Sequence, residues 1–336
     1  MHLKNPFRGQ NESTICPDAL FPSVDADLPL QLLARCPDYK ETPLHHRQIE
    51  PIKGEIFIKD ERGRMGLGSF KALGAAYVIA HLAQGKNVAD TIFVTASAGN
   101  HGLSVAAGAK VFGARSVVYL SHTVPETFAE KLRLQGAKVC REGDDYEASM
   151  AAAAKAASTN GWVLLSDSSW PGYTELPHRL MEGYLVMAAE TVKQMKAAPT
   201  HIFLQAGVGG LAAACAAYFR SAWADAPNIT VVEPEAAPAL HNAIQAGHII
   251  GAAGPVSSMG RLDCKEASMI ALNGLARDAD RFVLVRDEEV EQMMPVLADL
   301  GLTTTPSGGA GLATALLNKV NLPADARILV ILSEEE

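Results

Sequence analysis

Lys71 is the residue of this sequence whose surroundings most clearly suggest covalent chemistry. Residues 56–58 predict a short buried strand, and residues 70–83 predict a long apolar helix that begins beside Lys71, with Ser69 as its N-cap. The positive end of the helix dipole and the apolar neighbours both favour the neutral amine, so we expect a lowered lysine pKa. A neutral lysine is a nucleophile toward an aldehyde. The competing interpretation is a helix-terminal lysine that points into water.

A second segment with small and polar residues, Thr-Ala-Ser-Ala-Gly-Asn-His-Gly at 95–102, lies between a predicted strand and a predicted helix. Ligands of open α/β sheets bind at such junctions, and small residues let the backbone approach them closely. Ser97, Gly99 and Asn100 offer hydrogen-bond donors, and the helix N-terminus adds favourable charge for a substrate carboxylate. The simpler interpretation of this segment is a helix cap.

A third segment, Gln-Ala-Gly-Val-Gly-Gly-Leu at 205–211, follows a predicted strand at 201–204. Glycines at such a turn leave the backbone N–H groups accessible, and the start of a helix adds positive potential. The N–H groups of Gly207, Val208, Gly209 and Gly210 therefore predict a cradle for a phosphate group. A phosphate-bearing aldehyde that a lysine attacks is pyridoxal phosphate.

The same turn has a competing interpretation. Gly207, Gly209 and Ala212 fit the Gly-x-Gly-x-x-Ala dinucleotide fingerprint, and Glu233 ends the next predicted strand, where an acid would bind a ribose. On this turn alone, an NAD-dependent dehydrogenase stays open.

These segments are separated by regular alternation of predicted strands and helices. Besides 56–58, apolar runs predict strands at 91–95, 116–120, 138–140, 162–165, 201–204, 229–232, 282–285 and 328–332, with helices between them and a loop at 251–265. Such alternation predicts an α/β fold of two domains, with mostly parallel sheets and helices on both faces. We place a large domain at residues 1–75 plus 185–336 and a small domain at 76–184.

Composition excludes several classes of function. The chain has 336 residues, 48% of them hydrophobic, and a net charge of −8 without any basic run, so we expect no nucleic-acid partner. No apolar run reaches membrane-spanning length, and the first residues lack the apolar core of a secretory signal. Five widely spaced cysteines indicate reduced thiols in a cytoplasmic protein, and we expect no metal site.

Taken together and in this order, the segments resemble the fold-type-II family of pyridoxal-phosphate enzymes, whose fold is that of tryptophan synthase β. Within it, they are most similar to diaminopropionate ammonia-lyase and its relatives, including threonine and serine dehydratases. The resemblance covers residues 37–333 and rests on these pieces: Lys59-Asp-Glu, residues 66–74, 99–102 and 167–174 with Pro177, residues 205–209, Val232-Glu-Pro and Ser307-Gly.

The resemblance implies a role for each matching residue. Lys71 would be the Schiff-base lysine, and Asn100 would bind the 3′ oxygen of pyridoxal phosphate. Residues 207–210 would hold its phosphate, and Ser333 would meet the ring nitrogen. A hydroxyl at that nitrogen suits elimination over transamination, with Lys71 removing the Cα proton.

Two further residues match family positions near the reacting centre. Asp167 could protonate the leaving group, or it could simply cap a helix. Tyr173 could line the substrate pocket, or it could belong to the core. The acidic residues 334–336 are expected to form a frayed terminus.

Two departures from the family pattern concern the substrate. Ser97, Ala98 and Gly99 form the predicted substrate turn, and Ala98 stands where diaminopropionate ammonia-lyases carry an aspartate that serves the D-isomer; we therefore expect an L-configured substrate. Arg261, in a charged loop, could bind a second anionic group of the substrate. The alternative for Arg261 is a salt bridge with Asp263 or Glu266.

The expected activity is elimination of ammonia or water from a small L-amino acid, with release of a 2-oxo acid. Three alternatives remain at this stage: β-replacement as in cysteine synthase, the NAD-dependent dehydrogenase, and a non-catalytic sensor. The family resemblance also implies a homodimer.

Overall fold

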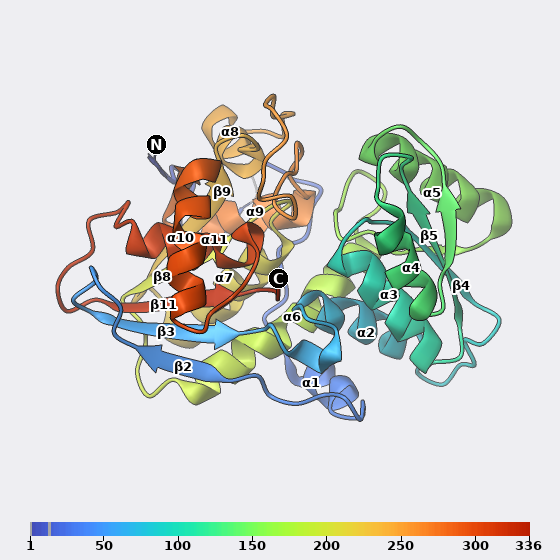
Figure 1. Ribbon diagram of the computed structural model, residues 1–336, viewed down its shortest axis with the longest axis horizontal. Coiled ribbons are helices and arrows are strands. Elements are labelled where there is room, and N and C mark those ends of the chain that lie inside the picture. The colour runs from blue at the N-terminus through green and yellow to red at the C-terminus, as the bar shows by residue number, and fades with distance from the viewer. Residues whose placement is uncertain (1, 13–14) are drawn as a thin grey trace.

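The computed structural model describes residues 2–12 and 15–336, which form two α/β bodies side by side (Figure 1). The larger body contains a sheet of strand order β1-β10-β9-β8-β11-β3-β2, and the smaller contains a sheet of order β6-β5-β4-β7. Neighbouring strands run parallel except at the edges of the larger sheet, where β1 and β2 are antiparallel to their partners. The predicted α/β class with mostly parallel sheets is confirmed.

The elements follow one another in the predicted alternation. The larger sheet is built from β1 (His2–Lys4), β2 (Leu44–Arg47), β3 (Glu55–Asp60), β8 (His201–Gln205), β9 (Asn228–Pro234), β10 (Arg281–Val285) and β11 (Arg327–Leu332). The smaller sheet is built from β4 (Ile92–Ala96), β5 (Arg115–Leu120), β6 (Lys138–Arg141) and β7 (Val163–Leu164). The helices are α1 (Asp27–Leu33), η1 (Arg64–Gly66), α2 (Lys71–Leu82), α3 (Asn100–Val111), α4 (Glu126–Leu134), α5 (Tyr146–Asn160), α6 (Glu175–Gln194), α7 (Gly210–Trp223), α8 (Ala239–Ala246), α9 (Met269–Asp278), α10 (Asp287–Asp299) and α11 (Pro306–Leu316).

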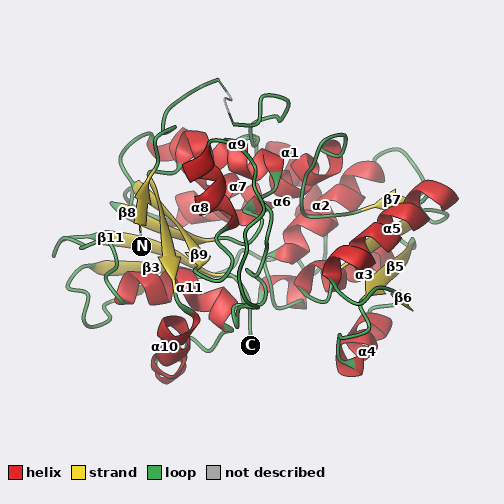
Figure 2. Ribbon diagram, turned by 90° about the horizontal axis from the view of Figure 1, so that it is seen from above, coloured by secondary structure: helices red, strands yellow, loops and turns green. Residues whose placement is uncertain are grey.

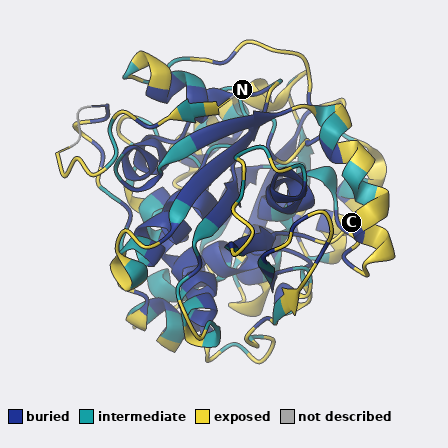
Figure 3. Cartoon of the chain, turned by 90° about the vertical axis from the view of Figure 1, so that its left-hand side faces the viewer, coloured by how far each residue is buried: buried dark blue, intermediate teal, exposed yellow. Residues whose placement is uncertain are grey.

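Both faces of the central strands are covered, which explains why those strands are continuous apolar runs. In β5, Val117 and Tyr119 pack toward α5, whereas Val118 and Leu120 pack toward α4 on the other face. In the larger sheet, α7 and α9 cover one face, and α10 and α11 lie on the other (Figure 2). Exposed residues gather on the outer helices and loops, while the central strands are buried (Figure 3). No helix of the described chain is long and apolar enough to cross a membrane.

Helices α2 and α6 cross closely where the two bodies meet. A Cβ on Gly183 would lie 2.6 Å from the Leu73 carbonyl oxygen, and a Cβ on Gly74 would lie 2.7 Å from a ring carbon of Tyr184. Only glycine allows this approach, since either contact is shorter than a real Cβ tolerates. The crossing fixes the start of α2, and therefore Lys71, against the ring of Tyr184.

The strand ends bring the predicted site segments to one place. In a parallel sheet the carboxyl ends of the strands share an edge, and the segments after β3, β8 and β11 of the larger sheet are among those singled out in the sequence. The segment after β4 of the smaller sheet meets them where the two bodies join, since Asn100 binds Glu334. The C-terminus lies at the junction of the two bodies (Figures 1 and 2). The four strands of the smaller sheet span residues 92–164; the exact domain limits stay a prediction.

Candidate active site

Lys71 and Asp167 form the centre of the site. Lys71 is the first residue of α2, and its Nζ lies 2.5 Å from Oδ2 of Asp167, which follows β7. The same Nζ lies 5.2 Å from the ring centre of Phe70 and 5.9 Å from that of Tyr184. About a fifth of each side chain of the pair is exposed. The helix begins as predicted, but Phe70 occupies the N-cap position, and the Ser69 hydroxyl accepts from the Lys71 N–H at 3.3 Å.

The predicted lowering of the Lys71 pKa is wrong for the free amine, which is paired with Asp167. Burial does act in that direction, but the Asp167 carboxylate outweighs it and raises the pKa of Lys71. Burial likewise would raise the pKa of Asp167, and the ammonium of Lys71 holds that pKa well below its usual range. The two groups are therefore an ion pair, a partnership between residues 96 positions apart that a local sequence pattern does not contain.

The turn after β4 lies beside this pair. Gly99 is the N-cap of α3, and its N–H donates to the Ser97 hydroxyl at 3.2 Å. A Cβ on Gly102 would lie 2.7 Å from the Ser97 carbonyl oxygen, so the turn packs tightly onto the first turn of α3. Asn100 begins α3, and its Nδ2 donates to Oε2 of Glu334 at 2.5 Å. The turn thus faces the C-terminal segment across the junction of the two bodies.

Glu334 is a member of the site that the sequence did not single out. Its side chain is buried, and its Oε1 accepts from the Thr305 hydroxyl. The segment that carries it pairs with the residues before Lys71: the Phe70 N–H donates to the Ser333 carbonyl oxygen, and the Glu335 N–H donates to that of Gly68. The expectation of a frayed terminus is therefore wrong for Glu334. The sequence feature that could have identified Glu334 as a site residue is its position just after a buried strand, next to Ser333.

The glycine turn after β8 fits a phosphate group. A Cβ on Gly207 would lie 2.8 Å from Sγ of Cys264, and Gly209 has a φ of +100°, which favours glycine. In the described part of the chain, the N–H groups of Gly207, Gly209 and Gly210 donate to no protein acceptor, and Gly210 begins α7. Free N–H groups at a helix start form an anion site. The Cβ position of Gly210 lies 3.9 Å from the Asp167 carbonyl oxygen, so the cradle adjoins the ion pair.

Arg261 lies between the cradle and the substrate turn. Its N–H donates to the Ser307 hydroxyl at 3.0 Å, and a Cβ on Gly99 would lie 3.3 Å from its Cδ. Nearly half of the side chain, 45%, is exposed, and its Nε lies 3.9 Å from the Glu334 carboxylate. Among the described residues, neither alternative salt bridge of Arg261, with Asp263 or with Glu266, is formed; Asp263 is bound by Lys265 at 2.6 Å instead.

Tyr173 supports the segment that carries Asp167. Its hydroxyl donates to the Leu164 carbonyl oxygen at 2.8 Å and accepts from the Ser166 N–H at 3.0 Å. Its ring stacks on Trp170 with 4.4 Å between ring centres. Both hydrogen-bonding positions are thus occupied by backbone, and a contact between Tyr173 and substrate stays a prediction.

Glu233 does not have the freedom that a ribose-binding acid needs. It is buried, and its two carboxylate oxygens accept from the N–H groups of Leu240 at 2.7 Å and His241 at 2.8 Å, at the start of α8. Burial raises the pKa of Glu233 to about 8, although these two N–H groups act against the shift. The carboxylate is a helix cap, which removes the main support for the dehydrogenase interpretation.

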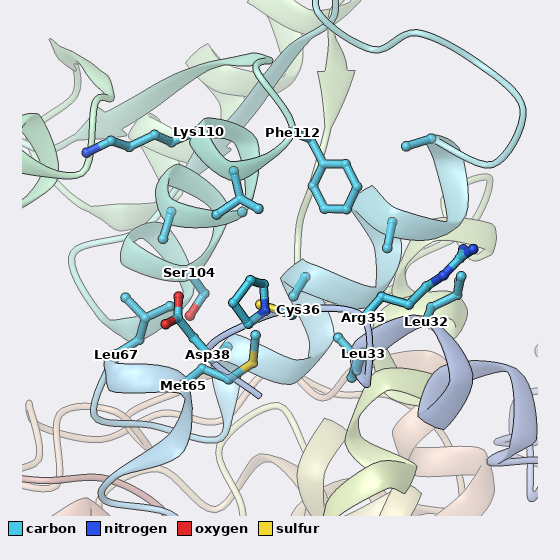
Figure 4. Close-up of a pocket in the computed structure, with 18 of the residues that line it drawn as sticks. Leu32, Leu33, Arg35, Cys36, Asp38, Met65, Leu67, Ser104, Lys110 and Phe112 are labelled. Atoms are coloured by element: carbon cyan, nitrogen blue, oxygen red, sulfur yellow. The ribbon is translucent and has the colours of Figure 1, made fainter. Parts of the chain in front are cut away.

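A cavity of about 700 Å³ lies apart from this site, between α2, α3 and the segment after α1 (Figure 4). It is lined mainly by apolar side chains, among them Leu33, Met65, Ala76, Val111 and Phe112. None of the predicted site residues lines it. The cavity is therefore a feature of the outer face of α2 and α3, separate from the Lys71–Asp167 pair.

Comparison with known families agrees with the geometry of the site. A model of the family described as pyridoxal-phosphate dependent enzyme matches residues 36–334. This match includes every element that contributes to the ion pair, the substrate turn and the glycine cradle.

Individual relatives within this family are ammonia-lyases. Diaminopropionate ammonia-lyase of Salmonella typhimurium is 32% identical over 89% of this chain and 86% of its own length. L-threonine ammonia-lyase of Thermotoga maritima is 25% identical over 84% of this chain and 67% of its own length. Among solved structures, Escherichia coli diaminopropionate ammonia lyase in complex with an aminoacrylate-PLP azomethine reaction intermediate has a TM-score of 0.89 and 28% identity, covering 100% of this chain and 94% of that one.

Proposed function

The chain belongs to the family of pyridoxal-phosphate-dependent enzymes, and on that premise we propose that it eliminates ammonia or water from a small L-amino acid, with release of a 2-oxo acid. The cofactor is pyridoxal 5′-phosphate. The observation that carries the proposal is the Lys71–Asp167 ion pair beside the glycine cradle of residues 207–210. Lysine, acid and phosphate site are the parts that such an elimination needs.

Four segments of the chain would share the contacts with the cofactor. The N–H groups of residues 207–210 would hold the phosphate, and Lys71 would bind the aldehyde carbon. The Asn100 amide would meet the ring oxygen, and the buried Ser333 would meet the ring nitrogen. When bound, pyridoxal phosphate withdraws electrons from the Cα of an amino acid joined to it.

Lys71 and Asp167 would carry the proton transfers. Lys71, once displaced by the substrate amine, takes the Cα proton. Before that step the amine would be neutral, the proton of its former ammonium would reside on Asp167, and the burial that raises the Asp167 pKa would act without the opposing charge of Lys71. When Lys71 takes the Cα proton, its positive charge would return and lower the Asp167 pKa, so that Asp167 gives its proton to the leaving group. The ion pair therefore links the base step to the acid step.

The substrate turn would set the configuration of the substrate. Ser97, Ala98 and Gly99 lie at the N-terminus of α3, which favours a carboxylate. Ala98 has no ionisable group, so this turn offers no second base opposite Lys71. An L-configured amino acid, whose Cα proton faces the lysine, is the substrate we expect.

Arg261 would bind a second anionic group on the substrate. Its guanidinium borders the substrate turn, is 45% exposed and has no close carboxylate partner, since Glu334 is 3.9 Å from its Nε. A cation there repels the β-ammonium of diaminopropionate and attracts a carboxylate. We therefore favour a substrate with an acidic group on or beyond the β carbon, unlike that of the diaminopropionate relatives.

We also propose that two copies of the chain associate through the face that carries the cavity in Figure 4. Val111 and Phe112 line it, and Val111 is 62% exposed. Exposed apolar residues around an apolar cavity are typical of a covered surface. Sedimentation of the wild type and of Val111→Asp tests the dimer.

The free thiols of Cys36, Cys140 and Cys215 support a cytoplasmic location.

The proposed function is tested with purified protein and pyridoxal phosphate. We expect visible absorbance on binding, loss of that absorbance in Lys71→Ala, and 2-oxo acid from an L-amino acid without any added nucleophile. A requirement for an added nucleophile would indicate β-replacement instead. Failure to bind pyridoxal phosphate would refute both activities.

A further inference from the structure

Glu334 is a buried carboxylate in the site to which the proposed reaction gives no task. It is 3% exposed, and its Oε2 accepts from Nδ2 of Asn100 at 2.5 Å. Its Oε1 accepts from the Thr305 hydroxyl, and its backbone carbonyl oxygen accepts from the Thr304 hydroxyl at 2.5 Å. Three hydrogen bonds therefore hold one residue at the junction of the two bodies. A frayed terminal residue would make none of them.

The charges around Glu334 are unusual for a buried acid. The cationic groups that face it are Arg261, from the loop between α8 and α9, and Lys71, from α2, and neither makes a close ion pair with it. Burial raises the pKa of Glu334, while the Thr305 hydroxyl, the two cations and the Asn100 amide act against that rise. Lys71 is already paired with Asp167. The groups in direct contact with the two carboxylate oxygens are therefore both neutral, the Thr305 hydroxyl on Oε1 and the Asn100 amide on Oε2.

This contact fixes which way the Asn100 amide faces. A side-chain amide carries an acceptor oxygen and a donor NH₂ group that can exchange places by a half-turn, and an ionised carboxylate only accepts. Glu334 therefore selects the orientation in which the NH₂ group faces the site. That group has two N–H bonds, and one of them remains available after the other donates to Glu334. A donor of this kind is what the ring oxygen of the cofactor needs.

We propose that Glu334 is a positioning residue for the cofactor, which acts through Asn100 by holding its NH₂ group toward the ring oxygen of pyridoxal phosphate. This inference rests on the proposed cofactor site. The segment after β11 would then contribute two residues to the cofactor site, Ser333 and Glu334. This role also explains why Thr304 and Thr305, at the start of α11, both hold Glu334.

The test is the affinity for pyridoxal phosphate, measured by equilibrium dialysis on the full chain. Glu334→Gln keeps the shape but can present an NH₂ group of its own to Asn100, which then turns. We expect the dissociation constant to rise about tenfold, as for loss of one charge-assisted hydrogen bond, with an unchanged melting temperature. Glu335→Gln is the matched control, because Glu335 is the exposed neighbour of Glu334 and its backbone N–H donates to Gly68; its affinity should equal that of the wild type.

Two further measurements separate positioning from a merely structural role. In wild type, affinity should fall on the acidic side as Glu334 takes up a proton, and this part of the pH profile should be absent in Glu334→Gln. In the Asn100→Ala background, Glu334→Gln should cause no further loss, since residues that act as one unit are not additive.

Each outcome decides the proposal. An unchanged or tighter affinity in Glu334→Gln, an unchanged pH profile, or additive losses with Asn100→Ala would overturn it. If Glu334→Gln does not fold, Glu334→Asp withdraws the carboxylate by one methylene group, and unchanged affinity there would overturn it equally. Failure of the wild type to bind pyridoxal phosphate would instead refute the proposed function.

Discussion

Two clusters of the same composition lie at either end of the segment 61–71. Each contains one lysine, one arginine and two carboxylates. The first, which we call the sealed cluster, consists of Lys59, Glu61, Arg64 and Glu190. Its side chains are 0–1% exposed, and Arg64 binds both glutamates at 2.7 Å. Lys59 also donates to Glu190 at 2.7 Å, so every charge has an opposite charge in contact.

The second cluster, which we call the open cluster, consists of Lys71, Asp167, Arg261 and Glu334. Only Lys71 and Asp167 are in direct contact, and Arg261 is 3.9 Å from Glu334. The side chains of Lys71 and Arg261 are 21% and 45% exposed. The open cluster thus keeps charges that other molecules can still reach.

The difference shows what each cluster can do. A buried charge whose partners are all present is fixed, because losing any contact leaves another charge uncompensated in a medium of low polarity. The sealed cluster therefore anchors the turn of η1, which leads into Lys71. The open cluster has unsatisfied charge and solvent access, which are the requirements for binding and for proton transfer.

The largest effect expected is that of Lys71→Ala in the open cluster. Removal of the amine would remove both the proposed bond to the cofactor and the proposed base, so we expect elimination to fall by about 10³-fold or more. The fold should survive, since the position is partly exposed and alanine is a good helix former. Assays of 2-oxo acid formation, together with melting temperature, check both statements. Residual activity near that of the wild type would exclude Lys71 as the reacting amine.

The opposite result is expected for Arg64→Ala in the sealed cluster. This change leaves Glu61 and Glu190 buried with one cation, Lys59, between them, so we expect a loss of about 3–5 kcal/mol in the free energy of unfolding. Urea denaturation measures it. A loss below about 1 kcal/mol would mean that water enters the cluster and that the comparison of sealed with open is wrong.

The sequence could predict those features of the fold and of the site that depend on a local pattern. Strand and helix positions followed from apolar runs and periodicity, because nearly every strand is covered on both faces. The edge strands β1 and β2 were missed, because they lie in a polar, proline-bearing stretch and pair with only one neighbour each. Glycine and serine turns at strand ends were found, since their chemistry is local.

Contacts between distant segments were not predictable from a single sequence. The ion pair that reverses the expected lysine pKa joins Lys71 to Asp167, and the contact that buries Glu334 joins it to Asn100. Both arise where two sheets meet, so neither leaves a periodic pattern. Arg261 was noticed only because charge is unusual in a loop of its kind, and its neighbours came from the structure.

Asp167→Asn tests whether the pair of the open cluster is ionised. The Asp167 pKa is lowered on folding, so its pairing stabilises the protein above the unfolded aspartate pKa of about 4 and this stability is lost as pH falls through the lower folded value. The difference in unfolding free energy between wild type and variant should therefore shrink below about pH 4. Activity should fall about 10²-fold. A difference independent of pH would contradict the ion pair.

The smallest and most selective effect is expected for Arg261→Ala. The side chain is half exposed and not closely paired, so its loss should leave unfolding free energy unchanged within about 0.5 kcal/mol. For an amino acid with a second carboxylate, we expect kcat/KM to fall about 10- to 100-fold, the cost of one charge-assisted contact, while small neutral substrates lose less than about threefold. Lys265→Ala is the matched control, because it removes a cation of the same loop that is already bound to Asp263. Equal losses for acidic and neutral substrates would contradict the proposed role of Arg261 in substrate selection. A charge that selects between two substrates must act on the group in which they differ.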